Sequence, residues 1–165
     1  MINNKSDLII FSSIFFLFYL SCEKDDICLS ETHGTPKLII RMVNKESPLL
    51  YKGLEGLLIK AIGNKNPINI ESADSITLPL NPFKNYTQFE FIKNQGNENE
   101  NIDTVQINYS VNNIYINRAC SYKGSFIFNS NALTIINNKN KWIEGYIILK
   151  DTIKNEEQAH LALLH

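Results

Sequence analysis

Apolar and polar residues alternate along most of the chain from Pro36 onward. In the stretch DTVQINYSV, residues 103–111, every second residue from Val105 to Val111 is apolar and the residues between them are polar. A period of two is typical of a β-strand with one buried face. The same alternation and further apolar runs predict strands at 38–43, 57–62, 76–80, 87–91, 104–111, 114–119, 125–129, 133–136, 143–149 and 159–164.

Asparagine-rich segments between these runs predict turns. VNN at 111–113 and NSN at 129–131 supply residues that tolerate left-handed backbone dihedrals, as tight hairpins require. NQGNENEN at 94–101 has no apolar residue and predicts a polar loop. Pro79 and Pro82 cut one apolar run short, which is typical of an edge strand.

No segment after Pro36 shows a convincing helical period. The last stretch, EEQAHLALLH, contains good helix formers, but it is short. We therefore expect a terminal strand with Leu161 and Leu163 facing inward, with room for one helical turn before it. About eight to ten short strands with turns between them predict an all-β fold. The expected architecture is a single antiparallel β-sandwich, with an immunoglobulin-like arrangement as the specific candidate, and the chain shows no internal repeat and no second domain.

Before this region lies an apolar segment that is too short to span a membrane. Residues 8–20 read LIIFSSIFFLFYL, whereas a helix that crosses a bilayer needs about 20 apolar residues. The length fits the hydrophobic region of a signal peptide, and Lys5 supplies a weak positive charge that Asp7 offsets. A buried helix of the domain is the alternative, which the lack of a polar 3.6-residue period disfavours.

The first cysteine lies where this apolar segment ends. The sequence YLSC at 19–22 resembles a bacterial lipobox, in which a small residue precedes a cysteine that is lipidated and becomes the new amino terminus. Tyr19 departs from the leucine that is usual at its position. Two or three acyl chains, at about 0.8 kcal/mol per buried methylene, make a durable anchor. The predicted parts are a signal peptide at 1–21, a tether lipidated on Cys22 at 22–35, and a β-sandwich domain at 36–165.

A run of charge follows Cys22. Glu23, Lys24, Asp25 and Asp26 resemble the lysine-plus-acidic signal that, in Bacteroidota, sends lipoproteins across the outer membrane. We therefore predict a lipid-anchored outer-membrane protein with its domain on the cell surface. A periplasm-facing domain behind a simple solvated tether is the alternative, and a secreted protein with an unlipidated Cys22 is a weaker rival.

Two cysteines remain, Cys28 and Cys120. An even number in an oxidising compartment predicts a disulfide. It closes a loop of roughly 90 residues and contributes at most about 4 to 5 kcal/mol by loop-closure entropy. Neither cysteine lies in a CxxC pair or near a histidine at metal-ligand spacing. Two unpaired thiols are the alternative.

Composition and charge disfavour one class of partner. The chain has 165 residues, 44% of them hydrophobic, and a net charge of −1 with a pI near 6.3. The length and the hydrophobic content suffice for one globular core. The net charge gives no positive field that would attract a polyanion. The sequence predicts no nucleic-acid partner.

The common catalytic and metal-binding signatures are missing from the sequence. His33, His160 and His165 lack the spacing to another ligand that makes a metal site specific, so we expect solvated or capping histidines. The GxSxG, HExxH, P-loop and GxGxxG patterns do not occur. We therefore predict a protein that is not an enzyme and that uses no cofactor or metal.

Arginines and aromatic residues are the remaining candidates for ligand contacts. Arg41 and Arg118 are the only arginines, and both fall in predicted strands. A rigid guanidinium fork suits a structural ion pair or a ligand contact, of which we favour the structural role. Core packing is the commoner role of strand aromatics, but four of them could form a platform for sugar: Tyr109, Tyr115, Tyr122 and Trp142.

Three hydroxyl residues follow an aspartate and precede an aliphatic residue. Ser75, Thr104 and Thr152 thereby match the acceptor used for O-glycosylation in exported Bacteroidota proteins. The motif is short and strands often begin in this way, so chance is the rival explanation. A glycosylated hydroxyl must point to solvent.

Seven segments stand out when the chain is read as a whole: CEKDDIC, GTPKLIIR, DSITLPL, DTVQINYS, IYINRACSYK, NKWIEGYI and NEEQAHLALLH. Together they resemble an uncharacterised family of Bacteroidota lipoproteins, domain of unknown function 6452. The most specific are CEKDD at 22–26 and RACSYK at 118–123. The resemblance implies a small envelope lipoprotein and brings no known catalytic residue.

We therefore expect a lipid-anchored outer-membrane lipoprotein of unknown biochemical activity, with a non-enzymatic binding or envelope-assembly role. The expected partners are the membrane, through the N-terminal lipid, and an unknown protein or glycan. A surface glycan-binding or glycan-processing accessory is the alternative function.

Overall fold

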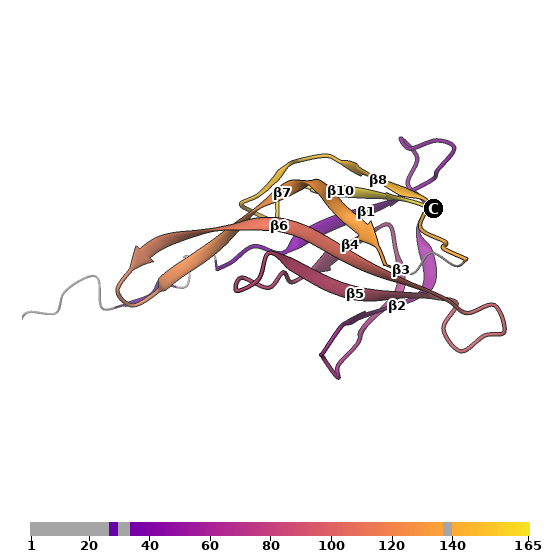
Figure 1. The fold of residues 1–165 in the computed structure, drawn as a ribbon, viewed down its shortest axis with the longest axis horizontal. Coiled ribbons are helices and arrows are strands. Elements are labelled where there is room, and N and C mark those ends of the chain that lie inside the picture. Colours follow the sequence, from indigo (N-terminus) through magenta and orange to yellow (C-terminus); the bar gives the residue numbers. More distant parts are fainter. Residues whose placement is uncertain (1–26, 30–33, 137–139) are drawn as a thin grey trace, which may run out of the picture. The chain divides into compact units, whose positions relative to one another are not determined.

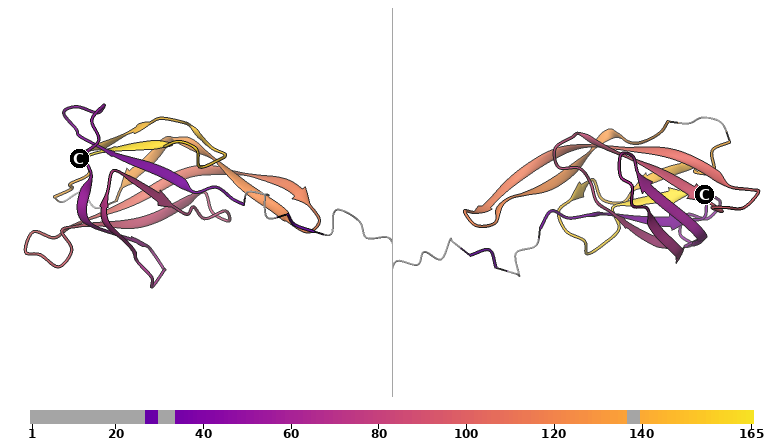
Figure 2. Two further views of the ribbon diagram at one scale, coloured as in Figure 1. Left: turned by 180° about the vertical axis from the view of Figure 1, so that it is seen from behind. Right: turned by 90° about the horizontal axis from the view of Figure 1, so that it is seen from below.

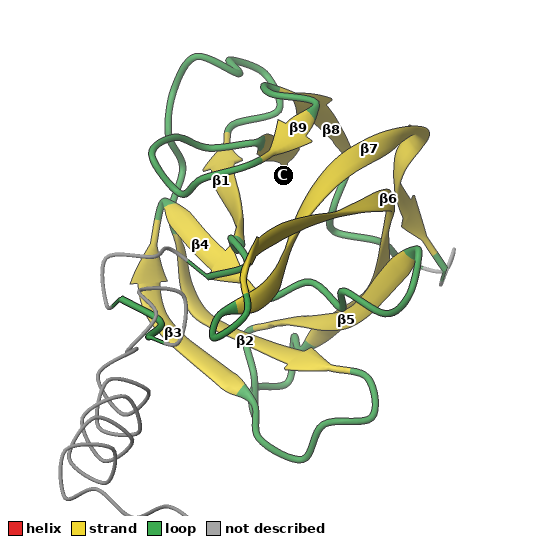
Figure 3. Cartoon of the chain, turned by 90° about the vertical axis from the view of Figure 1, so that its left-hand side faces the viewer, coloured by secondary structure: helices red, strands yellow, loops and turns green. Residues whose placement is uncertain are grey.

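The computed structural model describes residues 27–29, 34–136 and 140–165 and divides the chain into two compact units. Within these ranges there are ten strands and no helix, so none that is long and apolar enough to cross a membrane (Figures 1 and 3). We call residues 27–29 and 115–122 the tip unit. The sheet unit is the rest of the described chain, 34–114, 123–136 and 140–165.

One sheet of the sheet unit has four strands. Its order is β4 (Ser75–Leu78), β1 (Leu38–Val43), β10 (Leu161–Leu164) and β8 (Gly145–Ile148). β1 and β10 run parallel, with Ile40 opposite Leu161, whereas the other two pairs are antiparallel. The prediction of a wholly antiparallel fold is therefore wrong at this pair, because the first and the last strand bury the same apolar face side by side.

The second sheet has six strands, all in antiparallel pairs where the register is defined. Its longest strands, β6 and β7, lie side by side (Figure 2) and continue along the chain into the tip unit. The order is β3 (Ile68–Ala73), β2 (Leu54–Ala61), β5 (Tyr86–Lys93), β6 (Asn101–Asn117), β7 (Ser121–Ile135) and β9 (Thr152–Ile153).

The two sheets share one hydrophobic core, to which every second residue of the main strands contributes. β6 shows the alternation that the sequence predicts, since Val105, Ile107 and Tyr109 are fully buried and the residues between them are not. The Tyr109 hydroxyl donates to the Asn81 carbonyl at 2.9 Å and bonds to Thr87 Oγ1, so its polar end is satisfied. Burial raises the pKa of Tyr109, because the charged phenolate would lose its hydration.

Several strand predictions are confirmed. β4 is an edge strand, in agreement with the prolines that follow it. β10 is a strand whose Leu161 and Leu163 are fully buried. Residues 94–100 form the predicted polar loop between β5 and β6.

The two asparagine turns are wrong. Residues 111–113 lie inside β6 and residues 129–131 lie inside β7. Two residues of the second segment bond to the facing strand instead: Asn129 Oδ1 accepts from Ser110 Oγ at 3.1 Å, and the main-chain carbonyl of Asn131 accepts from Asn108 Nδ2 at 2.9 Å. Cross-strand bonds of this kind override the local preference of asparagine for turns. The sequence also gave no signal for β3.

Candidate functional site

The loop between β1 and β2, residues 44–53, carries the most exposed apolar run of the sheet unit. Leu49 is 94% exposed, Leu50 62% and Tyr51 56%. The loop is nevertheless ordered by its own backbone, because the Leu50 amide donates to the Ser47 carbonyl at 2.8 Å and the Asn44 amide donates to the Leu50 carbonyl at 3.1 Å. The loop therefore exposes apolar side chains on a backbone that its own hydrogen bonds hold in one conformation.

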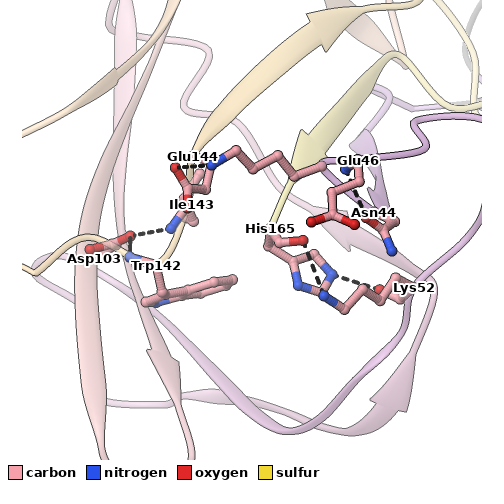
Figure 4. Close-up of polar contacts among 9 residues, drawn as sticks. Asn44, Glu46, Lys52, Asp103, Trp142, Ile143, Glu144 and His165 are labelled. Atoms are coloured by element: carbon pink, nitrogen blue, oxygen red, sulfur yellow. Dashed lines mark hydrogen bonds and ion pairs between the residues drawn. The ribbon is translucent and has the colours of Figure 1, made fainter.

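His165 holds the two ends of this loop at the end of β10. Its ring Nε2 donates to the Lys52 carbonyl at 2.7 Å in the matching tautomer. The His165 carbonyl accepts from Lys52 Nζ at 3.3 Å and from the Lys45 amide at 3.4 Å. Figure 4 shows the contacts between His165 and Lys52. Burial lowers the pKa of His165, so the neutral ring that makes these contacts is favoured.

A buried carboxylate fixes the segment that packs against His165 (Figure 4). Asp103 is fully buried, and its Oδ2 accepts from the Trp142 amide at 3.0 Å and from the Ile143 amide at 2.8 Å. The Trp142 indole donates to the Phe91 carbonyl at 3.2 Å and meets the His165 ring edge to face at 6.1 Å. Asp103 therefore fixes the segment before β8 to the six-stranded sheet, and its carboxylate serves as a structural acceptor.

The predicted arginine ion pair is wrong within the described residues. Both ion pairs found there use lysine, Lys45 with Glu144 and Lys60 with Glu90. Arg41 instead lies over the Tyr51 ring at 4.5 Å, a cation–π contact that holds the exposed end of the β1–β2 loop against β1. No acidic side chain lies opposite Arg41, since its strand partners are Ser75 and Ala162.

The tip unit contains the predicted disulfide between Cys28 and Cys120, which are 92 residues apart in sequence. The Cys120 amide donates to Asn117 Oδ1 at 2.6 Å, and Ser121 has a φ of 60°, so the chain reverses between β6 and β7 here. The Tyr115 and Tyr122 rings meet edge to face at 5.3 Å. Their exposed fractions are 57% and 63%.

The four aromatic residues do not form the sugar platform that was the alternative to core packing, and the favoured core role is confirmed for Tyr109 and Trp142. Tyr109 is fully buried and Trp142 is 8% exposed, and both pack into the core of the sheet unit because their polar ends find backbone partners there. The two tyrosines of the tip unit are exposed, but their planes are inclined by 64° and form no flat stacking surface.

Two of the three histidines predicted to be solvated or capping are buried instead of solvated, and both rings bond to backbone groups. His160 is fully buried and His165 is 8% exposed. His160 Nδ1 accepts from the Ile39 amide at 3.1 Å. The ring therefore takes the place of the backbone carbonyl that a neighbouring strand would offer to this amide of β1. Burial lowers the pKa of His160. His33 lies outside the described residues.

A cleft of about 480 Å³ lies next to β9 in the sheet unit. Two of its lining side chains are held by main-chain amides, because Glu156 Oε1 accepts from the Lys37 amide at 3.0 Å and Thr35 Oγ1 accepts from the Gly124 amide at 3.0 Å. Lysine and glutamate side chains both line the cleft, so its charge favours neither an anionic nor a cationic ligand. The lining residues are Gly34, Thr35, Pro36, Lys123, Lys154, Asn155, Glu156 and Glu157.

The candidate glycosylation residues differ in exposure. Ser75 is exposed at the start of the edge strand β4, whereas Thr104 and Thr152 are half-buried. The Thr152 hydroxyl donates to Asp151 Oδ1 at 3.0 Å. Glycosylation at these three positions stays a prediction. The lipidation residue Cys22 and the export signal Glu23, Lys24, Asp25 and Asp26 lie outside the described residues.

Among the described side chains no group of three His, Cys, Asp or Glu residues could hold a metal ion. Sequence reasoning missed the β1–β2 loop and the support that Asp103 and His165 give it. The signal for the loop was present in Pro48 followed by Leu49, Leu50 and Tyr51, a short apolar run that matches neither the strand before it nor the strand after it.

Comparison with family models matched residues 56–165 to one family, described as a family of unknown function (DUF6452). The comparison with curated proteins found no match, and neither did the comparison with solved structures.

Proposed function

Because the chain belongs to this family of unknown function, we propose its role from its structure: it is a lipid-anchored envelope protein whose β domain binds a partner without catalysis. In this proposal Cys22 carries the lipid, the outer membrane of a bacterium of the Bacteroidota holds it, and the two sheets form a β-sandwich that presents loops. The observation that carries the binding role is the exposed apolar run of the β1–β2 loop on a fixed base.

The disulfide supports an address outside the cytoplasm. A bond between Cys28 and Cys120 persists in an oxidising compartment, such as the periplasm or the cell surface. Cys22 lies six residues before Cys28. An anchor at Cys22 would therefore be tied by a short chain to a covalently closed part of the protein.

The β1–β2 loop has the properties of a binding element. The exposed side chains of Leu49 and Leu50 add little to the stability of the fold. Each would contribute roughly 1.5 to 3 kcal/mol to binding if a partner buried it fully. The contacts of Lys52 and Arg41 already order the loop, so little conformational entropy is lost when it binds. Exposed Leu side chains with an aromatic neighbour on a rigid base favour a protein partner.

The position of the loop within the sheet unit fits this role. The described chain enters the sheet unit at Gly34, just before β1. The β1–β2 loop follows the other end of β1. The strand therefore separates the entry point of the sheet unit from the proposed binding loop.

A glycan ligand is the alternative, and the burial of Tyr109 and Trp142 weakens the support for it. A glycan array with the intact protein separates the two proposals. Binding to a defined glycan that survives Leu49→Asp would favour the glycan function over the loop-mediated one.

Site-specific photo-crosslinking tests the partner proposal. A photoreactive residue replaces Leu49 in the full chain in its own cells, and a matched chain carries it at Asn97, which is exposed in the polar 94–100 loop. We expect a discrete protein adduct from position 49, lost when Leu50→Asp is added and retained when Asn94→Asp is added. Equal adducts from both positions, or none from either, would contradict the proposal, and the acyl mass of the N-terminal peptide tests the anchor separately.

A further inference from the structure

The tip unit exposes an unusual surface for so short a piece of chain. Ile27 is 58% exposed, Leu29 59%, Tyr115 57% and Tyr122 63%. All four lie within a few residues of the disulfide that joins the two segments of the unit. Exposed aliphatic and tyrosine side chains close to one another in the chain fit a partner that has an apolar region next to a polar one.

We propose that the tip unit lies in the headgroup region of the membrane that carries the anchor. The inference rests on the proposed lipidation of Cys22. It adds to that proposal a second contact, in which the tyrosine rings and the aliphatic side chains of residues 27–29 enter the boundary between headgroups and acyl chains. Tyrosine prefers this boundary because its ring is apolar and its hydroxyl remains hydrated.

Among its described residues the tip unit carries a single charged side chain, a cation. Arg118 is exposed at the turn between Tyr115 and Tyr122, and it forms no ion pair with another described residue. No Asp or Glu occurs among residues 27–29 and 115–122. A cation near an anionic membrane surface gains about 1 kcal/mol, and its long side chain reaches a phosphate while its stem stays among apolar groups.

The length of the tether allows the contact. Five residues lie between Cys22 and Cys28, so the two Cα atoms are six steps apart and, at about 3.5 Å per step, at most about 21 Å from each other. The disulfide holds the Cys120 Cα 4.9 Å from the Cys28 Cα. Cys120 therefore stays within about 26 Å of the lipidated residue along any path, close enough for the tip unit to reach the headgroup layer of the membrane that holds the anchor.

Tryptophan fluorescence in vesicles tests the proposal. The full lipidated protein is reconstituted in vesicles of phosphatidylethanolamine and phosphatidylglycerol, with Tyr122→Trp as the reporter in the tip unit. Tyr51→Trp is the matched control, because Tyr51 has nearly the same exposed fraction, 56%, in the β1–β2 loop. The native Trp142 is buried and supplies the same background in both variants.

We expect a blue-shifted emission from Tyr122→Trp, and quenching by lipids brominated on their acyl chains that is several-fold stronger than for Tyr51→Trp. Arg118→Glu should reduce that quenching in vesicles that contain phosphatidylglycerol. Tyr115→Trp gives a second reporter in the same unit if the first variant fails to fold. Equal quenching in the tip and control variants would overturn the proposal.

Flotation of the vesicles separates the two levels of inference. A protein that carries the acyl mass and floats with the vesicles, but whose tip reporters remain unquenched, overturns the membrane contact and leaves the anchor intact. Such a tip would be a surface for a protein partner instead. A protein without the acyl mass that fails to float overturns the anchor together with the contact that rests on it.

Discussion

The same two strands pass through both units of the molecule, but different forces stabilise them in each. In the sheet unit β6 pairs with β5 from Asn101 to Asn108 and with β7 on its other side, and one face of it is buried. In the tip unit the hairpin has exposed tyrosines and a disulfide. A two-stranded hairpin is marginal in water, so the strands need a crosslink or an external surface where the neighbouring strand ends.

Removing the crosslink is the largest change that the comparison predicts. The double variant Cys28→Ser with Cys120→Ser should lower the free energy of unfolding by up to about 4.6 kcal/mol, the loop-closure value for a loop of 92 residues. The loss arises because the unfolded chain gains freedom across the whole loop, which includes β1 to β6. Urea unfolding of the full chain measures it.

Hydrogen exchange shows where the same bond acts in the folded state. Amides of residues 115–122 should exchange faster in the double variant, whereas the amides of β5 should keep their relative protection. Reduced parent protein is the matched control and should behave as the variant does. An unchanged unfolding midpoint would contradict the role given to the disulfide.

The second change affects the sheet unit alone. Asp103→Ala removes the acceptor of the Trp142 and Ile143 amides and should cost about 3 kcal/mol of unfolding free energy, because two buried donors lose their partner. Asp103→Asn keeps one acceptor oxygen and should cost less. Asp74→Ala is the control, since that side chain is exposed. A loss in Asp103→Ala no larger than in the control would show that the segment is held by packing.

The alternating pattern predicted the parts of the fold that depend on one strand at a time. Val105, Ile107 and Tyr109 are buried as their spacing requires, and the same holds for Leu161 and Leu163. Burial of every second residue is a property of the strand itself, so a single sequence contains it.

Features that depend on distant partners were not predictable in this way. Asp103 looked like part of a short surface motif, because its amide donors lie 39 and 40 residues further along the chain. His160 gave no sign that it would accept a bond from Ile39, 121 residues away. The asparagines of β6 and β7 were assigned to turns for the same reason: local preference is visible in the sequence, and pairing across strands is not.

The smallest expected effect is a pH dependence that separates the two units. Burial holds the pKa of His160 below its usual 6.5, and protonation of Nδ1 would also break its bond with the Ile39 amide. A lowered folded-state pKa means that the neutral ring stabilises the fold fully above pH 6.5 and that this contribution is lost as the pH falls below 6.5. The nearby charges of Lys150 and Glu156 act in opposite directions and do not change the sign.

His160→Asn tests this sign, because the amide oxygen can still accept from Ile39 but does not titrate. The unfolding free energy of the parent should fall between pH 7.5 and pH 5.5, and that of the variant should fall less, with His165 accounting for part of what remains. Equal slopes in parent and variant would contradict the assignment. Residues 27–29 and 115–122 contain no histidine or carboxylate side chain, so their exchange rates, corrected for intrinsic pH effects, should stay constant over the range in which the sheet unit loses stability.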